Sequence, residues 1–321
     1  MIDVSVIVVT YKGWVRLDKC LASLVLSSGT RFSKEVIIVD NTPDPEEISL
    51  IKSKYNQFTY IHNPVNGGYG YGVNYGAVKA SGKYLLVLNP DTVVTEEAID
   101  RMISFEQTGH PGTLISCKQV NEKGRECNVT GEFPRFLNLT GLLRSIFKPP
   151  LPPEIDNMIY PEWVSGSVML FSRETFDRLN GFDEDFWMYF EDMDICSRIR
   201  ESGGNVALLT NCVIEHNHGG SSRTDARTTS LTKTEVHISR HVFITKHIKG
   251  FKGAAIQTFL VINNLLTSLL VAVPGIVFFF IPKMFVRALI FKNLVAYYLN
   301  SILKGTWISP RSVNYIKRHH S

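Results

Sequence analysis

The N-terminal part of the chain alternates short apolar runs with segments of helix length. The runs lie at residues 4–10, 35–39, 58–62 and 86–88; three consist mainly of Val, Ile and Leu, and the run at 58–62 reads Phe-Thr-Tyr-Ile-His. Runs of this length, separated by segments that can hold a helix, predict right-handed βαβ units and a parallel sheet. We therefore expect an α/β fold with helices on both faces of the sheet.

Polar side chains follow three of these runs, at the points where the predicted strands end. Thr10 closes the first run, Asp40 and Asn41 follow the second, and Asp91 follows the fourth. Ligands of parallel sheets bind beyond the carboxyl ends of the strands. We expect these four residues to line one crevice.

Length and cysteine content narrow the class of protein. The 321 residues are enough for about two structural units. The five cysteines are scattered and show no Cys-x-x-Cys spacing, which indicates reduced thiols rather than a disulfide framework or a zinc site. The sequence enters its first apolar run without a basic leader or a cleavable apolar segment, so we expect no export.

The C-terminal part of the chain has a different charge balance from the rest. The net charge is +4, yet residues 236–321 contain 11 Lys and Arg and no acidic residue. Residues 253–282 carry no charge at all. A helix over residues 253–273 would be about 32 Å long, enough to cross a bilayer, and Pro274 with Gly275 should end it.

This segment could span the membrane, turn back within it, lie in the interface or form a buried core helix. Cations flank it on both sides, and aromatic residues such as Phe278, Tyr298 and Trp307 are interspersed with them. That mixture is typical of a surface facing anionic headgroups. We expect membrane association, and no nucleic-acid partner, because the basic residues flank apolar sequence.

A glycine-rich segment lies at residues 66–76. Glycine lets backbone approach a ligand closely, and amides that open a helix suit phosphate. The strict Gly-x-Gly-x-x-Gly spacing is absent, as is a Gly-Lys-Ser/Thr loop. The segment is therefore either a ligand-contacting element or a plain glycine-rich turn.

Acidic and aromatic residues are interleaved at residues 182–194. We expect a helix from Glu191 through Arg200 to Gly203, whose N-terminal dipole the acids Glu191, Asp192 and Asp194 complement. Capping explains only part of the acidic content. Burying carboxylates among aromatic rings is costly unless they face water, a metal or a substrate.

Taken in order, these motifs closely resemble the inverting glycosyltransferases of family 2, and within them the bacterial rhamnosyltransferase-like group. The resemblance covers about residues 3–225. Its motifs are Val9-Thr10-Tyr11, Val39-Asp40-Asn41, Asn66-Gly67-Gly68 with Asn74, Asn89-Pro90-Asp91, Gly166, Glu191-Asp192, and His216 ahead of Gly219-Gly220-Ser221.

The resemblance implies a GT-A fold, a mostly parallel Rossmann-like sheet flanked by helices. It implies a catalytic domain at residues 1–235, with a nucleotide-binding half at 1–92 and an acceptor and catalytic half at 93–235. Residues 236–321 would form a basic, apolar, helical membrane-associated region. Residues 132–162 look like a loop that could close over substrate.

The resemblance also implies a donor site and a metal site. The donor-binding residues would be Thr10, Tyr11, Asp40, Asn41, Asn66, Gly67, Gly68, Asn74, Asn89 and Asp91. Asp40 could accept the imide N–H of uracil or thymine. Asp91 and His216, with His218 as the alternative, would bind Mg²⁺ or Mn²⁺. Asn89 replaces the first Asp of the Asp-x-Asp motif, which implies a metal site with one carboxylate.

For catalysis, the resemblance assigns Asp192 as the base that deprotonates the acceptor hydroxyl, with Glu191 orienting the acceptor or the base. The acceptor-binding residues would be Gly166, Trp187, Tyr189 and Glu191.

The implied function is transfer of L-rhamnose from dTDP-L-rhamnose to a lipid-linked, polyprenyl diphosphate oligosaccharide for cell-surface polysaccharide. The enzyme would work at the cytoplasmic face of a bacterial membrane. Alternatives are a UDP-sugar donor (hexose, N-acetylhexosamine or galactofuranose), a nucleotide-binding oxidoreductase, and a non-catalytic membrane-associated nucleotide-sugar-binding module.

Overall fold

The computed structural model forms two compact units. It describes residues 2–25, 31–108, 112–135, 152–217, 225–278 and 280–319. The first unit contains residues up to Phe133, Pro150–Asp183 and Glu191–Gly220; the second contains Pro134–Pro149, Glu184–Phe190 and Ser221–Ser321. His218 and the motif Gly219-Gly220-Ser221 lie outside the described residues, as do residues 136–151 of the predicted loop.

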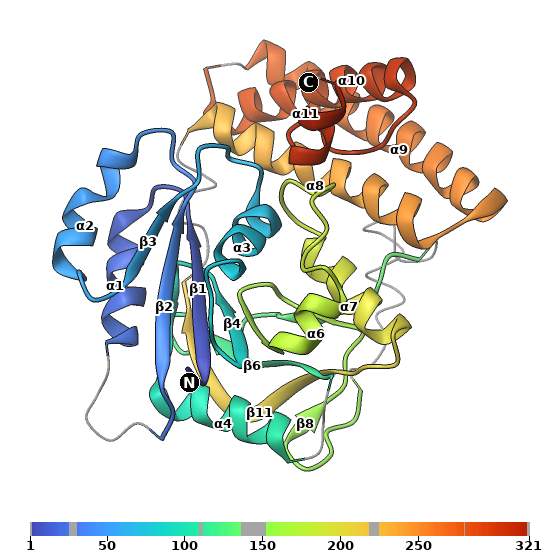
Figure 1. Cartoon of the computed structure of the whole chain (residues 1–321). Coiled ribbons are helices and arrows are strands. Elements are labelled where there is room, and N and C mark those ends of the chain that lie inside the picture. The colour runs from blue at the N-terminus through green and yellow to red at the C-terminus, as the bar shows by residue number, and fades with distance from the viewer. Residues whose placement is uncertain are drawn as a thin grey trace. The chain divides into compact units, whose positions relative to one another are not determined.

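The first unit alternates strands and helices along most of its length (Figure 1). Its strands are β1 (Val4–Thr10), β2 (Lys34–Asp40), β3 (Thr59–His62), β4 (Tyr84–Leu88), β5 (Thr92–Val93), β6 (Leu114–Val120), β7 (Thr130–Gly131), β8 (Met158–Ile159), β9 (Trp163–Val164), β10 (Val168–Ser172) and β11 (Val206–His216). Its helices are α1 (Trp14–Leu24), a 3₁₀ turn at Pro45–Ile48, α2 (Ser49–Lys54), α3 (Tyr69–Ala77), α4 (Glu96–Gln107), α6 (Arg173–Arg178) and α7 (Glu191–Glu201).

The main sheet is mixed but mostly parallel in direction. Its strand order is β3-β2-β1-β4-β10-β6-β11-β5, with β8 pairing to β11. Strands β1 to β4 pair in parallel, and β6 and β11 run the same way. Only β10, β5 and β8 run in the opposite direction. This confirms the predicted α/β architecture of a GT-A-like fold.

The strands form because their apolar residues are buried on both faces. Alternate β1 residues enter different clusters: Val6 and Val8 face one layer, and Ile7 and Val9 the other. The first layer includes apolar residues of α1, α2 and α4, and the second those of α3 and α7. A sheet covered on both faces gives continuous apolar strands, which explains the runs in the sequence.

The predicted strands and the predicted α7 are confirmed within a residue or two of their ends. The predicted loop 132–162 is corrected in part, since Met158–Ile159 forms β8. All five cysteines are free thiols, as predicted.

The second unit is helical. It contains α8 (Ala226–His247), α9 (Gly250–Val277), α10 (Pro282–Lys304) and α11 (Val313–His319). The domain boundary predicted after residue 235 falls inside the continuous helix α8, whereas the structure divides the chain ahead of that helix.

Helix α9 is longer than predicted and continues past Pro274, so the expected break at Pro274-Gly275 is wrong. The reason lies in the packing of α10. A Cβ on Gly275 would lie 2.4 Å from the backbone oxygen of Met284, so α10 supports the last turn of α9 at close range.

Helix α9 is the one helix among the described residues that is long and apolar enough to cross a membrane. Only 28% of its most apolar window is buried, which argues against the core-helix reading. Its buried side carries polar residues: the amide of Asn264 donates to the hydroxyl of Tyr298 over 2.9 Å, and Gln257 hydrogen-bonds His241. Its other side exposes a stripe of apolar residues, Ile262, Leu266, Leu269, Leu270, Val273, Ile276 and Val277.

Candidate active site

The candidate site lies at one edge of the sheet in the first unit. Parallel strands β1, β2 and β4 end there at Thr10, Asp40 and Leu88, and β11 ends there at His216. Because β10 runs the opposite way, the turn before it, with Gly166, meets the same edge. Topology therefore brings distant parts of the sequence together.

The predicted nucleotide-binding residues are buried at the ends of β1 and β2. Thr10, Asp40 and Asn41 are 1%, 2% and 4% exposed. The Asn41 amide is fixed on both sides: its oxygen accepts from the amide of Asn63 over 2.7 Å, and its nitrogen donates to the Gly68 carbonyl over 3.3 Å. These bonds hold the Asn41 side chain in one orientation.

Asp40 has one oxygen in use and one without a partner. Its Oδ1 accepts from the backbone N–H and the hydroxyl of Thr42, while the buried Oδ2 has no hydrogen-bond partner among the residues that the structure describes. Burial raises the pKa of Asp40 above its usual range. A buried acceptor of this kind is costly unless a ligand donor reaches it.

The glycine-rich segment forms helix α3 rather than a plain turn. Gly68 precedes the helix with φ 102°, a backbone conformation that favours glycine. A Cβ on Gly72 would lie 2.7 Å from Cγ1 of Val9, and one on Gly76 would lie 2.8 Å from Cγ2 of Val39. These glycines allow α3 to pack directly onto β1 and β2.

Asn74, predicted for the nucleotide pocket, braces another segment in the structure. Its side-chain nitrogen donates to the carbonyl of Phe182 and its oxygen accepts from the Phe182 N–H, both over 2.8 Å. This pair of hydrogen bonds fixes the backbone at Phe182, where the acidic and aromatic segment begins.

Asp91 and His216 lie side by side. The Nε2 of His216 is 3.3 Å from Oδ1 of Asp91. The other ring nitrogen, Nδ1, is 2.7 Å from Oε1 of Gln119, which also accepts from the hydroxyl of Ser167 over 2.8 Å. With Nδ1–H donating to Gln119, the lone pair of Nε2 points towards Asp91.

These two residues fit a divalent metal that is also held by substrate. No group of three or more His, Cys, Asp or Glu side chains that could hold a metal occurs among the described residues. Mg²⁺ is usually bound by one or two carboxylates with substrate phosphates and water, which needs no larger protein cluster. Asp91 and His216 could therefore hold the ion together with a diphosphate.

The predicted base, Asp192, is partly buried at the start of α7. Its Oδ2 accepts from the Gly166 N–H over 3.1 Å, and Oδ1 accepts from the Met193 N–H over 2.9 Å. Burial raises the pKa of Asp192, although these bonds oppose the shift.

Tyr69 holds the turn at Gly166, whose N–H bonds Asp192. Its hydroxyl donates to the Gly166 carbonyl over 2.7 Å. Burial raises the pKa of Tyr69 well above its usual range, and the charges of Glu191, Asp192 and Asp91 add to that effect.

The remaining predicted site residues differ in burial. Glu191 is buried beside Asp192, Gly67 is buried, and Tyr11, Asn66 and Asn89 are at least partly exposed. Trp187 and Tyr189 belong to the second unit.

Sequence reasoning missed Arg16, Gln119 and Tyr69. Arg16 lies on α1 with its Nη1 3.6 Å from Oδ2 of Asp91, and it also donates to the carbonyl of Asn217. The sequence offered a signal for Arg16, because it is a cation in the first turn of α1, directly after β1, and that turn contains no acidic residue. Gln119 could not be found from sequence, because its role depends on the pairing of β6 with β11.

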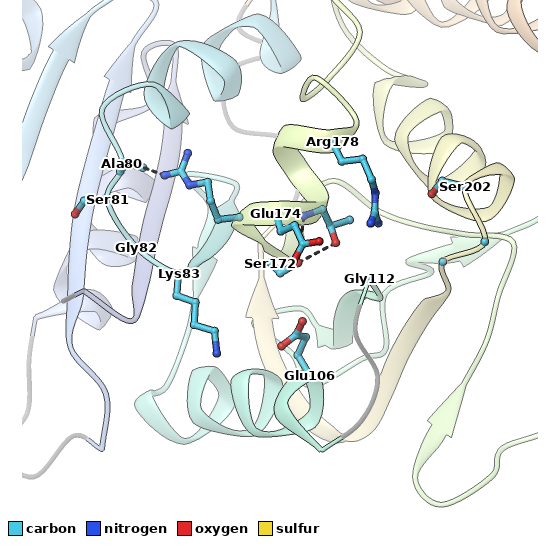
Figure 2. Close-up of a pocket in the computed structure, with 14 residues that line it drawn as sticks. Ala80, Ser81, Gly82, Lys83, Glu106, Gly112, Ser172, Glu174, Arg178 and Ser202 are labelled. Atoms are coloured by element: carbon cyan, nitrogen blue, oxygen red, sulfur yellow. Dashed lines mark hydrogen bonds between the residues drawn. The ribbon is translucent and has the colours of Figure 1, made fainter.

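A cavity of about 800 Å³ lies at the opposite edge of the sheet (Figure 2). It is lined by Lys83 before β4, Gly112 before β6 and Ser172 at the end of β10. Arg173 there donates to the carbonyls of Ala77 and Ala80 and so closes the end of α3. These contacts are structural, so the cavity is not the candidate active site.

The mixed sheet with its flanking helices is that of a GT-A-like fold. Residues 5–162 match glycosyl transferase family 2, and residues 157–219 match the family described as the N-terminal domain of galactosyltransferase. The family 2 match and the relatives named below as rhamnosyltransferases support a family 2 glycosyltransferase of the rhamnosyltransferase-like group.

Curated relatives include transferases for glycans of several kinds. The low-salt glycan biosynthesis hexosyltransferase Agl10 of Haloferax volcanii is 28% identical, over 64% of each chain. The N-acetylglucosaminyl-diphospho-decaprenol L-rhamnosyltransferase of Mycobacterium tuberculosis is 25% identical over 80% of this chain and 89% of its own. Rhamnosyltransferase WbbL of Escherichia coli is 28% identical over 52% of this chain and 67% of its own. The chain thus spans just under two thirds of the haloarchaeal relative.

Among solved structures, GalNAc-T7 with UDP, GalNAc and Mn²⁺ superimposes with a TM-score of 0.54 at 14% identity. The match covers 81% of this chain and 54% of that one. At this identity, the likeness supports the fold alone.

Proposed function

We propose that this protein transfers L-rhamnose from dTDP-L-rhamnose to a sugar on a polyprenyl diphosphate, with inversion of the anomeric carbon. The observation that carries the proposal is the cluster of Asp91, His216 and Arg16 at the same sheet edge as Asp192. The name of the mycobacterial relative supports L-rhamnose as the sugar and a polyprenyl diphosphate acceptor, and the E. coli relative is also named a rhamnosyltransferase. The dTDP carrier comes from the family resemblance of the motifs.

The nucleotide would bind at the ends of β1 and β2. The unpartnered Oδ2 of Asp40 is a suitable acceptor for the imide N–H of thymine or uracil. Thr10 and Asn41 would bind base and ribose beside it, with Tyr11, Asn66, Gly67 and Gly68 shaping the pocket. Satisfying a buried carboxylate oxygen would favour a pyrimidine nucleotide.

The diphosphate would lie beside the paired side chains of Asp91 and Arg16. The guanidinium of Arg16 can pair with phosphate oxygens, and its geometry suits that interaction. Asp91 and His216 would hold Mg²⁺ or Mn²⁺, with Asn89 offering a neutral oxygen. When bound, the cation offsets the charge that grows on the leaving diphosphate.

Asp192 would act as the general base. The Gly166 N–H holds Oδ2, so the carboxylate keeps a fixed orientation while it accepts the proton of the acceptor hydroxyl. Burial raises the pKa of Asp192 above its ordinary value. Tyr69 fixes Gly166 in turn, and Glu191 would orient the acceptor beside Gly166.

The helical unit would hold the enzyme on the cytoplasmic face of the membrane. The exposed stripe of α9 is long enough to lie along an apolar layer, and Lys283, Arg287, Lys292 and Lys304 on α10 supply cations for anionic headgroups. The buried polar side of α9 packs within its own unit, which favours an interfacial position over a spanning one.

A UDP-sugar donor is the second candidate. Asp40 would accept the imide N–H of uracil as readily as that of thymine, and the relatives include a hexosyltransferase. The non-catalytic alternative predicts binding without turnover.

The discriminating experiment is Asp192→Asn in the full chain, with transfer and nucleotide affinity measured separately. We expect a loss of transfer of about 10²–10⁴-fold, the usual contribution of general base catalysis, with dTDP affinity unchanged. Asp177→Asn, at the other edge of the sheet beside Arg173, is the matched control and should retain activity. Full activity in Asp192→Asn would remove Asp192 from the mechanism.

A further inference from the structure

Residues 184–190 form a short segment that the second unit holds. In the sequence this segment lies between two stretches of the first unit, yet its contacts place it with α8 and the C-terminal residues. The segment leads directly into Glu191 and Asp192 at the start of α7.

Asp185 anchors the segment. It is 7% exposed, and its Oδ2 accepts from Lys246 of α8 over 2.6 Å. Its Oδ1 accepts from the side-chain amide of Asn314 on α11 over 2.9 Å, and Arg318 lies 3.9 Å from the same oxygen. A buried carboxylate needs such partners, so these contacts fix where the segment starts.

Arg311 anchors the middle of the segment. Its guanidinium carbon lies 5.6 Å from the ring centroid of Trp187, within cation–π range. Its Nη1 is 3.0 Å from Oε2 of Glu235, which is completely buried on α8. Glu235 thus holds Arg311 in place, and Arg311 holds the indole.

The backbone of the segment also depends on these supports. Tyr189 and Phe190 have φ of 68° and 64°, in the left-handed region, although neither is glycine. Such residues cost on the order of 1–3 kcal/mol each and persist only when their surroundings impose them. The hydroxyl of Ser239 donates to the Met188 carbonyl over 2.8 Å, and the ring of Phe190 lies 6.1 Å from that of Phe243.

We propose that Asn314 and Arg311 are positioning residues for acceptor transfer. Asn314 acts through Asp185 and Arg311 through Trp187, and together they hold residues 184–190 in the conformation that sets the position of Asp192 at the start of α7. The inference rests on the proposed function, because it assigns the effect to the acceptor step. The C-terminal region would then serve catalysis as well as membrane attachment.

The test uses full-length Asn314→Ala, with Ile316→Ala on the exposed side of the same helix as the matched control. Transfer is measured with varied acceptor, dTDP affinity by calorimetry, and amide hydrogen exchange over residues 184–192. Small misplacements of catalytic groups can cost about 10²-fold in rate. We therefore expect acceptor kcat/KM to fall about 10- to 100-fold in Asn314→Ala, with faster exchange over 184–192 and unchanged dTDP affinity.

A second pair of variants guards against a folding defect. Arg311→Lys keeps a cation beside Trp187 and Glu235, whereas Arg311→Gln removes it. We expect Arg311→Gln to lower the acceptor kcat/KM and Arg311→Lys to retain most of the wild-type value. Unchanged acceptor kinetics and exchange in Asn314→Ala would overturn the inference, as would an equal loss of dTDP affinity. If the wild-type chain transfers no sugar, the proposed function fails, while hydrogen exchange still decides whether Asn314 holds the segment.

Discussion

Gly72 on α3 offers a sharp test of whether the glycine-rich segment serves packing or ligand binding. In Gly72→Ala, the new Cβ would lie 2.7 Å from Cγ1 and 3.2 Å from Cγ2 of Val9, and 3.3 Å from Nδ2 of Asn41. Overpacking a core costs about 1–3 kcal/mol, while Ala in place of Gly in a helix gains up to about 1 kcal/mol. The net expectation is a loss of about 1 kcal/mol, or a fall in Tm of about 2–4 °C for a unit of this size.

Val9→Ala supplies the second side of a double-mutant cycle. Alone it removes two buried carbons and costs about 2 kcal/mol. Combined with Gly72→Ala, it removes the methyl groups that collide with the new Cβ, so we expect a favourable coupling of about 1–2 kcal/mol.

The assay is thermal unfolding of the single and double variants, with dTDP affinity measured in parallel. Val78→Ala, at an exposed position at the end of α3, is the control and should change stability by less than about 0.5 kcal/mol. Additive losses, or an unchanged Tm together with a large loss of dTDP affinity, would refute the packing argument and indicate direct ligand contact.

Three further predictions concern charged residues. Arg16→Gln should weaken dTDP binding, because the cation beside Asp91 is lost, and calorimetry would show it; equal affinity would exclude Arg16 from the diphosphate site. His216→Gln should raise the Mn²⁺ concentration needed for half-maximal transfer by about 10-fold or more, whereas an unchanged metal titration would exclude His216 as a ligand. Burial raises the pKa of Glu235 from 4.5 to about 7. Between these two pH values the carboxyl group stays protonated in the folded chain and is ionised in the unfolded chain. The stability of the wild type relative to Glu235→Gln should therefore fall as pH rises from about 4.5 to about 7, by on the order of 3 kcal/mol; parallel profiles in urea unfolding would contradict this.

Much of the fold could be predicted because local pattern and tertiary burial agree. The run at residues 4–10 is apolar throughout because β1 is buried on both faces, so its boundaries were predicted without error. Helix α7 was also clear, since its acidic start and basic last turn complement the helix dipole.

Other features depend on tertiary contacts that no local pattern contains. Pro274 predicts a helix end, but close packing of α10 on Gly275 carries α9 onward. The glycines of α3 resemble a ligand loop, yet their spacing matches the side chains of β1 and β2. Gln119 reaches His216 only because β6 and β11 pair, and Arg311 reaches Trp187 across more than a hundred residues of sequence.

The most direct test of the central claim is sugar transfer by the purified full-length protein to a synthetic polyprenyl diphosphate sugar. The donors would be dTDP-L-rhamnose, UDP-glucose, UDP-N-acetylglucosamine and UDP-galactofuranose, each with Mg²⁺, Mn²⁺ or a chelator, and NMR would give the product's anomeric configuration. We predict metal-dependent transfer from dTDP-L-rhamnose with inversion. Preference for a UDP-sugar would contradict the proposed donor, and retention of configuration would contradict the role proposed for Asp192.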